Sequence, residues 1–150
     1  MVISMNNIEW RNAKKSNIEM IEEVERHFGI KFPKDFIECV LENDGGYPSH
    51  NVFFLNGREE SINNLLSIEN NKYKGMVNTA QSVLDRLNEN IVPFGEDAGG
   101  NLICFDYRYG TSPSIVFWDH EKAFMEADDA VIKIAETFTQ FLDCLQIFKD

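Results

Sequence analysis

The hydrophobic positions in the first part of the chain recur at helical spacing. Ile18, Ile21, Val24 and Phe28 fall on one stripe of a helix predicted over residues 17–28. Three glutamates lie off that stripe and are expected to face water: Glu22, Glu23 and Glu25. The pattern therefore predicts an amphipathic helix that packs one side on a core.

Turn and capping residues mark the ends of this helix and the start of a second. Ser16 and Glu19 have capping-box spacing, and Gly29 can take the left-handed conformation that ends a helix. Pro33 suits the first position of the next helix, which Asn43–Gly46 ends. The predicted buried face of that second helix has four members: Phe36, Ile37, Val40 and Leu41.

The middle of the chain is less regular. Val52–Leu55 is a short apolar run that predicts a strand, and the Asn-Gly pair that follows is a turn signal. Residues 60–68 fit either a strand or irregular structure, and residues 70–75 form a polar segment typical of a surface loop. Apolar residues at helical spacing predict a third helix over about residues 76–88: Met76, Ala80, Val83, Leu84 and Leu87.

The rest of the chain groups its strands before a closing helix. Strands are predicted at residues 91–94, 101–106 and 114–119, with a further short one at 131–135. The second and third of these carry continuous apolar runs, so we expect them to be buried on both faces of an antiparallel sheet. A helix over about residues 136–148 completes an α+β fold, with N- and C-terminal helices packing a mostly antiparallel sheet in one domain of residues 1–150. Five side chains should be almost fully buried: Phe36, Leu102, Cys104, Phe117 and Phe141.

Charge is the property of the composition that bears most on function. The 150 residues include 25 acidic and 14 basic ones, which gives a net charge of −11. That charge repels nucleic acid and anionic membranes and favours a basic partner, although solubility alone also accounts for it. No apolar run is long enough to span a membrane, and the first residues lack the features of a signal peptide. We therefore expect a cytoplasmic protein.

The three cysteines, Cys39, Cys104 and Cys144, are separated by gaps that match no metal-ligand spacing. Each lies in an apolar run, where a free thiol behaves as a small hydrophobic group. We expect all three to be free, structural and without a metal.

The motifs that carry catalytic chemistry in other proteins are missing here. The glycines at 95, 99 and 100 are not followed by the Lys-Ser or Lys-Thr of a phosphate loop. Asp97, Asn101 and Asp106 do not have the spacing of an EF-hand calcium loop. His120, between Asp119 and Glu121, is a single base at a strand end. We predict no catalytic residue, cofactor or metal, although one sequence leaves a dispersed catalytic site open.

Acidic and aromatic residues beside the turns are the candidates for binding a protein partner. We predict a surface formed by seven residues: Glu96, Asp97, Asp106, Tyr107, Tyr109, Asp119 and Glu121. The carboxylates would attract a basic partner, and the tyrosines would supply buried anchors. Because the turns of an antiparallel meander lie at opposite ends of their strands, these residues either form one patch or split into two. The patch with the tyrosines is then favoured. Tyr47, Tyr107, Tyr109 and Trp118 all fit an interface, but Trp118 and one of the tyrosines fit the core equally well.

Two blocks of the sequence stand out together: the first is Ile30–Phe36 followed by Asn43–Gly46, and the second is Val92–Asp106. In this order they resemble the SUKH superfamily, which includes bacterial toxin-immunity proteins and yeast cell-wall-synthesis regulators of the Smi/Knr type. Ile115–Glu121 and Phe138–Leu142 resemble later segments of the same family, so the resemblance covers about residues 17–145. It rests on the order and spacing of motifs that are individually ordinary.

The resemblance implies an α+β fold and a role in neutralising a co-encoded toxin, often a nuclease, by direct binding. It carries over no catalytic residue. We therefore expect a cytoplasmic immunity protein that acts as a monomer or weak homodimer on a basic, nuclease-like toxin domain, and binds neither nucleic acid nor membrane. The alternative is a regulatory scaffold of the cell-wall-regulator type.

Overall fold

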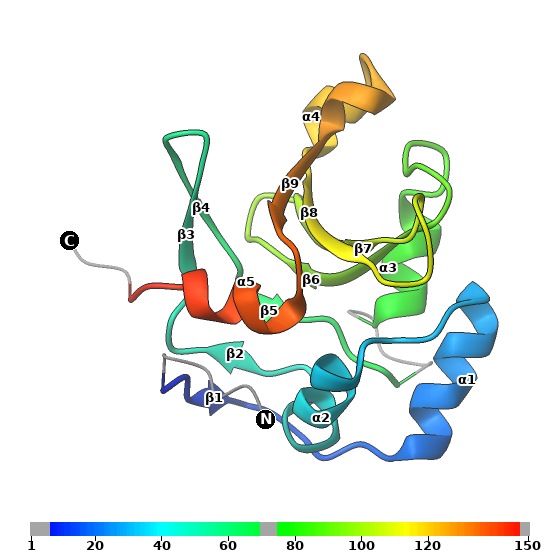
Figure 1. Cartoon of the computed structure of the whole chain (residues 1–150), viewed down its shortest axis with the longest axis vertical. Coiled ribbons are helices and arrows are strands. Elements are labelled where there is room, and N and C mark those ends of the chain that lie inside the picture. The colour runs from blue at the N-terminus through cyan, green and yellow to red at the C-terminus, as the bar shows by residue number, and fades with distance from the viewer. Residues whose placement is uncertain (1–6, 70–74, 148–150) are drawn as a thin grey trace.

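The centre of the molecule is a five-stranded antiparallel sheet (Figure 1). The computed structural model describes residues 7–69 and 75–147. The strand order is β5-β6-β7-β8-β9, so the last four strands follow one another as a meander. The bounds are β5 Asn64–Leu65, β6 Ile91–Glu96, β7 Leu102–Asp106, β8 Ser114–Trp118 and β9 Val131–Ala135. The predicted antiparallel sheet and α+β class are confirmed.

Both faces of this sheet are covered, as the continuous apolar runs predicted. Ile103 and Phe105 of β7 join the larger core cluster, while Leu102 and Cys104 face a smaller one on the other side. Trp118 of β8 is fully buried in the smaller cluster and is therefore a core residue. The five side chains expected to be buried are all buried.

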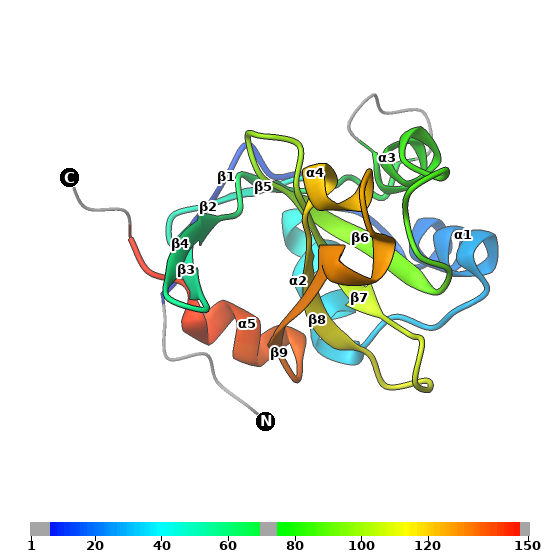
Figure 2. The same cartoon turned by 90° about the horizontal axis from the view of Figure 1, so that it is seen from above.

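Helices cover the two faces unequally. The larger core is closed by α1 (Ile18–Phe28), α2 (Lys34–Asn43) and α5 (Phe138–Cys144). In this core Phe36 of α2 packs edge to face against Phe94, Phe105 and Phe138, while Phe94 and Phe105 stack on each other. The smaller core is covered by the chain after α3 (Met76–Ser82) and by α4 (His120–Ala123). Figures 1 and 2 show α3 and α5 on opposite sides of the sheet.

Two small antiparallel pairs flank the main sheet. β3 (Val52–Leu55), the predicted strand, forms a hairpin with β4 (Arg58–Ser61) across the predicted Asn56-Gly57 turn, and β1 (Trp10–Arg11) pairs with β2 (Tyr47–Pro48). The Asn56-Gly57 turn has φ angles of 52° and 80°, the positive values that a tight hairpin turn of this type requires. The segment left open between strand and irregular structure contains part of β4 and all of β5.

Several predicted boundaries need correction. The third helix stops at Ser82 instead of about residue 88, and the closing helix is α5 rather than 136–148. Neither α4 nor the 3₁₀ turn Ala127–Ala130 was predicted. Residues 70–74 of the predicted surface loop, and Phe148, lie outside the described residues. No helix in the described part of the chain is long and apolar enough to cross a membrane.

Helix α1 ends at Phe28 with Gly29 in the left-handed conformation, as predicted, but differs from its prediction at its N-terminal end and on its polar face. Asn17 rather than Ser16 caps it, with the Asn17 side chain accepting from the Met20 N–H at 2.9 Å. Ile18 is exposed, whereas Glu25 is buried and accepts from the Phe32 N–H at 2.7 Å. The buried carboxylate is therefore part of the turn between α1 and α2, and only Glu22 and Glu23 face water as expected.

The cysteines are free within the described structure, but their surroundings differ. Cys104 is buried, and burial together with the negative charge of Asp106 raises the pKa of its thiol. Cys39 is half-buried, and burial raises its pKa to about 12. Cys144 is exposed, so the expectation that it packs as a buried hydrophobic group is wrong.

Candidate partner-binding surface

The register of the sheet separates the predicted surface into two groups. Glu96 of β6 lies opposite Leu102 of β7, which lies opposite Trp118 of β8. The segments that follow β6 and β8 and the segment that precedes β7 therefore meet at one end of the strands. We call this the Asp119 end and define it as Glu96, Asp97, Asp119 and Glu121. At the other end of these strands, Asp106 lies opposite Ile91 and Ser114. We call this the Tyr109 end and define it as Asp106, Tyr107 and Tyr109.

At the Asp119 end, Asp97 organises the turn between β6 and β7. Its Oδ1 accepts from the backbone N–H groups of Gly99 and Asn101, both at 2.8 Å. Its Oδ2 accepts from Asn101 Nδ2 at 2.9 Å. The half-buried carboxylate thus closes the turn by internal hydrogen bonds, while its charge stays at the surface.

Asn101 connects this turn to α4. Because Asp97 fixes the orientation of the Asn101 amide, the amide oxygen Oδ1 faces His120. That oxygen accepts from the His120 N–H at 3.1 Å and lies 2.7 Å from His120 Nδ1. An amide oxygen can only accept, so Nδ1 is the protonated ring nitrogen in this contact. The histidine is held in place by this pair of bonds at the start of α4.

The remaining carboxylates of the Asp119 end are placed by α4 and by β5. Asp119 caps α4, with its Oδ1 accepting from the N–H groups of Glu121 and Lys122 at 3.0 and 3.2 Å. Glu96 accepts from Asn64 Nδ2 at 3.1 Å. Glu121 is exposed. Among the described residues, no lysine or arginine forms an ion pair with any of these four carboxylates.

At the Tyr109 end, Asp106 is neutralised by its own neighbour. Arg108 Nε and Nη2 donate to the two carboxylate oxygens at 3.0 and 2.9 Å, and the Arg108 backbone N–H donates at 3.0 Å. Burial of Asp106 opposes its ionisation, but the hydrogen bonds and positive charge of Arg108 outweigh it and lower the pKa of this carboxyl group. Asp106 is buried, so it is not the exposed acidic contact that was expected.

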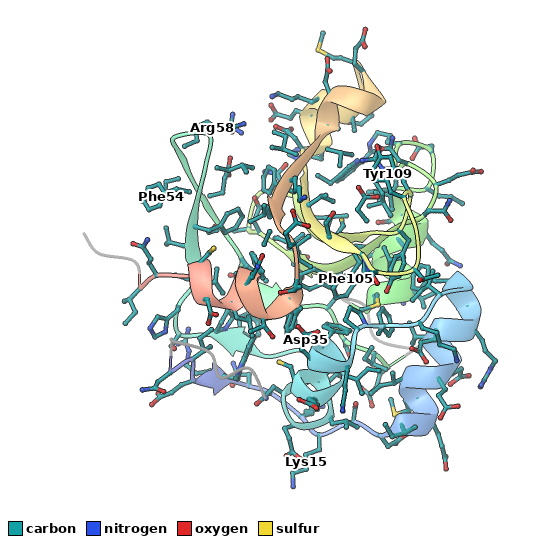
Figure 3. The ribbon with its side chains drawn as sticks, in the orientation of Figure 1. Lys15, Asp35, Phe54, Arg58, Phe105 and Tyr109 are labelled. Atoms are coloured by element: carbon teal, nitrogen blue, oxygen red, sulfur yellow. The ribbon has the colours of Figure 1, made fainter. Side chains whose placement is uncertain are left out.

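The two tyrosines of this end differ in exposure. Tyr107 is buried, and its hydroxyl donates to the Lys31 carbonyl oxygen at 2.7 Å. Burial, with a further contribution from the charge of Glu25, raises the pKa of Tyr107. Tyr109 is 85% exposed, and the Arg108 guanidinium lies 5.1 Å from its ring centroid (Figure 3). Only Tyr109 is available as an exposed aromatic anchor here.

Each end also has a groove. The groove at the Asp119 end has a volume of about 600 Å³, and we call it the α3 groove. Nine residues line it: Asn78, Thr79, Ser82, Val83, Arg86, Glu96, Gly100, Leu102 and His120. The groove at the Tyr109 end, of about 500 Å³, is lined by Arg26 and Lys31 as well as Glu25 and Tyr107. The Tyr109 end therefore mixes both signs of charge, whereas the Asp119 end is acidic.

Sequence reasoning missed the α3 and α4 contributions to this surface. The available signal was Asp119, a good N-cap residue that precedes the helix-compatible run His120–Ala123. No group of three or more His, Cys, Asp or Glu residues in the described parts of the chain is placed to hold a metal ion.

These features define an α+β protein in which the predicted binding residues lie at the two ends of the strands of one covered sheet. The chain belongs to the SMI1/KNR4 family (SUKH-1), whose family model matches residues 15–144. It is also similar to the SPbeta prophage-derived uncharacterized protein YokK of Bacillus subtilis (strain 168), with 35% identity over 72 residues. That match covers 48% of this chain and 35% of the relative, so this chain matches only about a third of that protein.

Proposed function

We propose that this chain is an immunity protein, which binds a cognate toxin domain and neutralises it by covering its working surface. Membership of the SUKH family is the observation that carries the proposal, because the family includes toxin-immunity proteins. The similarity to a prophage-derived protein is consistent with a role in competition between genetic elements. The proposal requires no chemical step, and places the protein in the cytoplasm, where the toxin would act.

The charge of the chain supports a basic, nuclease-like toxin as the partner. A nuclease that grips phosphates must present lysine and arginine, and a protein of net charge −11 can compete for that surface. The Asp119 end concentrates four carboxylates without a basic partner among the described residues, so it is the better docking end. The tyrosine patch was favoured from the sequence, but Tyr107 is buried, so Tyr109 is the exposed tyrosine of that patch.

The deciding experiment is co-expression with the toxin domain encoded next to this chain. We expect the chain to rescue growth of cells that express the toxin and to co-purify with it as a stable complex. Glu121→Lys should weaken the complex, while Glu23→Lys, the same charge change on exposed α1, serves as the matched control. If the wild-type chain neither rescues growth nor binds the toxin domain, the proposal fails.

The alternative is a regulatory scaffold, because the matching family also includes regulators of the cell-wall type. A solitary gene with no toxin neighbour, together with a stable complex with a chromosomally encoded host protein, would favour that function. A toxin gene directly upstream favours immunity.

A further inference from the structure

The α3 groove has two walls that come from distant parts of the chain. One wall is α3 and the turn after it, with Thr79, Ser82 and Arg86. The other is the β6–β7 turn and the start of α4, with Glu96 and His120. Leu102 and Val83 provide its apolar lining, so the groove offers an apolar surface, hydroxyl groups and one carboxylate together.

Exposed apolar side chains adjoin this groove. The Arg86 guanidinium, part of the groove lining, lies 4.1 Å from the centroid of the Phe124 ring and 5.8 Å from that of Trp118. Phe124 is 67% exposed, and Met125 beside it is 86% exposed. Large apolar residues this exposed are favoured anchors in protein interfaces, and a pair of them beside a groove indicates a docking surface.

The charges around the groove favour a cationic occupant. Glu96 is the one carboxylate of the Asp119 end that lines the groove. Asp97 is bonded to the turn that contains Gly100, and Asp119 and Glu121 flank the lining residue His120 in sequence. Glu126 and Asp129 line a second hollow together with Met125. The opposing cations are Arg86, whose Nη1 lies 3.6 Å from Asp85 Oδ1, and Lys122. Carboxylates therefore outnumber cations, and Arg86 already has an acidic neighbour.

We propose that the α3 groove binds an extended basic segment of the toxin domain. A lysine or arginine of the segment pairs with Glu96, and apolar side chains of the segment pack on Phe124 and Met125. This inference rests on the proposed function and deepens it by assigning the site and the chemistry of the contacting segment. A folded basic patch without such a segment would dock on the rim and leave the groove open.

Arg86 can contribute to binding a basic segment, although it is itself positively charged. Its Nε is buried and has no hydrogen-bond acceptor among the described residues, so turning the guanidinium toward a new acceptor breaks no bond at that atom there. An extended polypeptide presents backbone carbonyl oxygens, which accept from a guanidinium. Arg86 can thus hold the backbone of the segment while Glu96 holds a basic side chain.

Filling the groove tests the assignment. Ser82→Trp places an indole in the groove from an exposed position on α3, and Gln81→Trp makes the same change on the neighbouring exposed residue, which does not line the groove. We expect Ser82→Trp to weaken toxin binding by about tenfold or more and Gln81→Trp to leave it unchanged. Thermal unfolding of both variants establishes that they fold. Equal binding by the wild type and a folded Ser82→Trp would overturn the inference while leaving the immunity function intact.

A peptide probe tests binding in the α3 groove without the toxin. The probe is a short, end-capped peptide of alternating leucine and lysine. Its binding is monitored by the backbone amide chemical shifts of the whole protein. We expect shifts at Ser82, Gly100 and Leu102 that Ser82→Trp abolishes and that Glu96→Gln reduces. The counterpart with glutamate in place of lysine should cause none. Shifts elsewhere on the acidic surface, or no shifts at millimolar peptide, would overturn the groove assignment even if the toxin is bound.

Discussion

At the residue scale, the carboxylates of the family-like motifs act as structural acceptors. Asp35, in the segment after Pro33, accepts from the Phe36 N–H at 2.9 Å and from both the N–H and the hydroxyl of Thr139, at 2.9 and 2.8 Å. Asp44, before the glycine pair, accepts from the Ile68 N–H and the Ser67 hydroxyl, both at 2.9 Å. Each carboxylate thus ties a helix end to a distant segment, which gives the acidic residues of these motifs a structural role.

The link between Asp35 and Thr139 can be tested by removing the carboxylate. Asp35→Ala leaves the Thr139 N–H and hydroxyl without their acceptor at the junction of α2 and α5, and should cost about 1.5–3 kcal/mol, the range for hydrogen bonds to charged groups. Glu38→Ala is the matched control, because Glu38 is an exposed residue of the same helix. Guanidinium unfolding of both variants measures the difference. Equal stabilities would show that the link contributes nothing.

Tyr107 gives a prediction about alkaline stability. Its folded-state pKa is raised above the unfolded value of about 10, so its contribution is complete below that pH and is lost as pH rises through the folded-state pKa. Near pH 8, Tyr107→Phe should cost about 0.5–1.5 kcal/mol through the lost bond to Lys31. Above about pH 10 the wild type should lose stability more steeply than this variant.

Denaturant titrations of the wild type and Tyr107→Phe at several pH values measure the free energy of unfolding of each. The difference between the two should become smaller as pH rises above about 10. Tyr109→Phe, at a largely exposed position, is the control. A difference between wild type and Tyr107→Phe that stays constant with pH would contradict the prediction.

At the element scale, the sequence predicted strands correctly where apolar residues form a continuous run. It predicted the end of a helix wrongly where tertiary contacts determine the backbone conformation. The runs in β7 and β8 identified the central strands, because only a strand buried on both faces needs such residues. Val83 and Leu87 do pack on the smaller core, but from turns after α3, so their spacing correctly indicated burial and wrongly indicated helix.

The missed elements are short. β1 and β2 have two residues each and α4 has four, so none carries a period that a pattern search can detect. Because α4 forms one wall of the α3 groove, the groove could not be predicted either. The sequence pointed to the residues of both the Asp119 end and the Tyr109 end. The assignment of each residue to one end depended on the register of the sheet.

The closing helix α5 allows a direct test of the core. Phe141 is fully buried and packs edge to face against Phe53 and Phe94. Phe141→Ala should therefore cost about 3–5 kcal/mol. Cys144→Ala, at an exposed position of the same helix, should change stability little. A loss below about 1 kcal/mol for Phe141→Ala in a denaturant titration would show that α5 does not close the core as described.

At the scale of the whole molecule, the two ends of the sheet differ in charge and in exposed aromatic surface. The Asp119 end carries the unneutralised carboxylates, and long-range attraction from such a cluster raises association rates more than it slows dissociation. The Tyr109 end has cations and carboxylates together, with Asp106 paired to Arg108 and Tyr109 exposed. A buried aromatic contact at that end would instead act on the dissociation rate.

Binding kinetics with the cognate toxin domain therefore identify the docking end. Glu121→Lys should slow association, and added salt should reduce the difference from the wild type, because screening weakens attraction between exposed charges. Glu23→Lys, at an exposed position of α1 outside the Asp119 end, should have a smaller effect from the same change in net charge. Tyr109→Ala should leave both rates unchanged if the toxin docks at the Asp119 end. Faster dissociation of Tyr109→Ala together with unaltered association of Glu121→Lys would place the partner at the Tyr109 end and contradict the assignment.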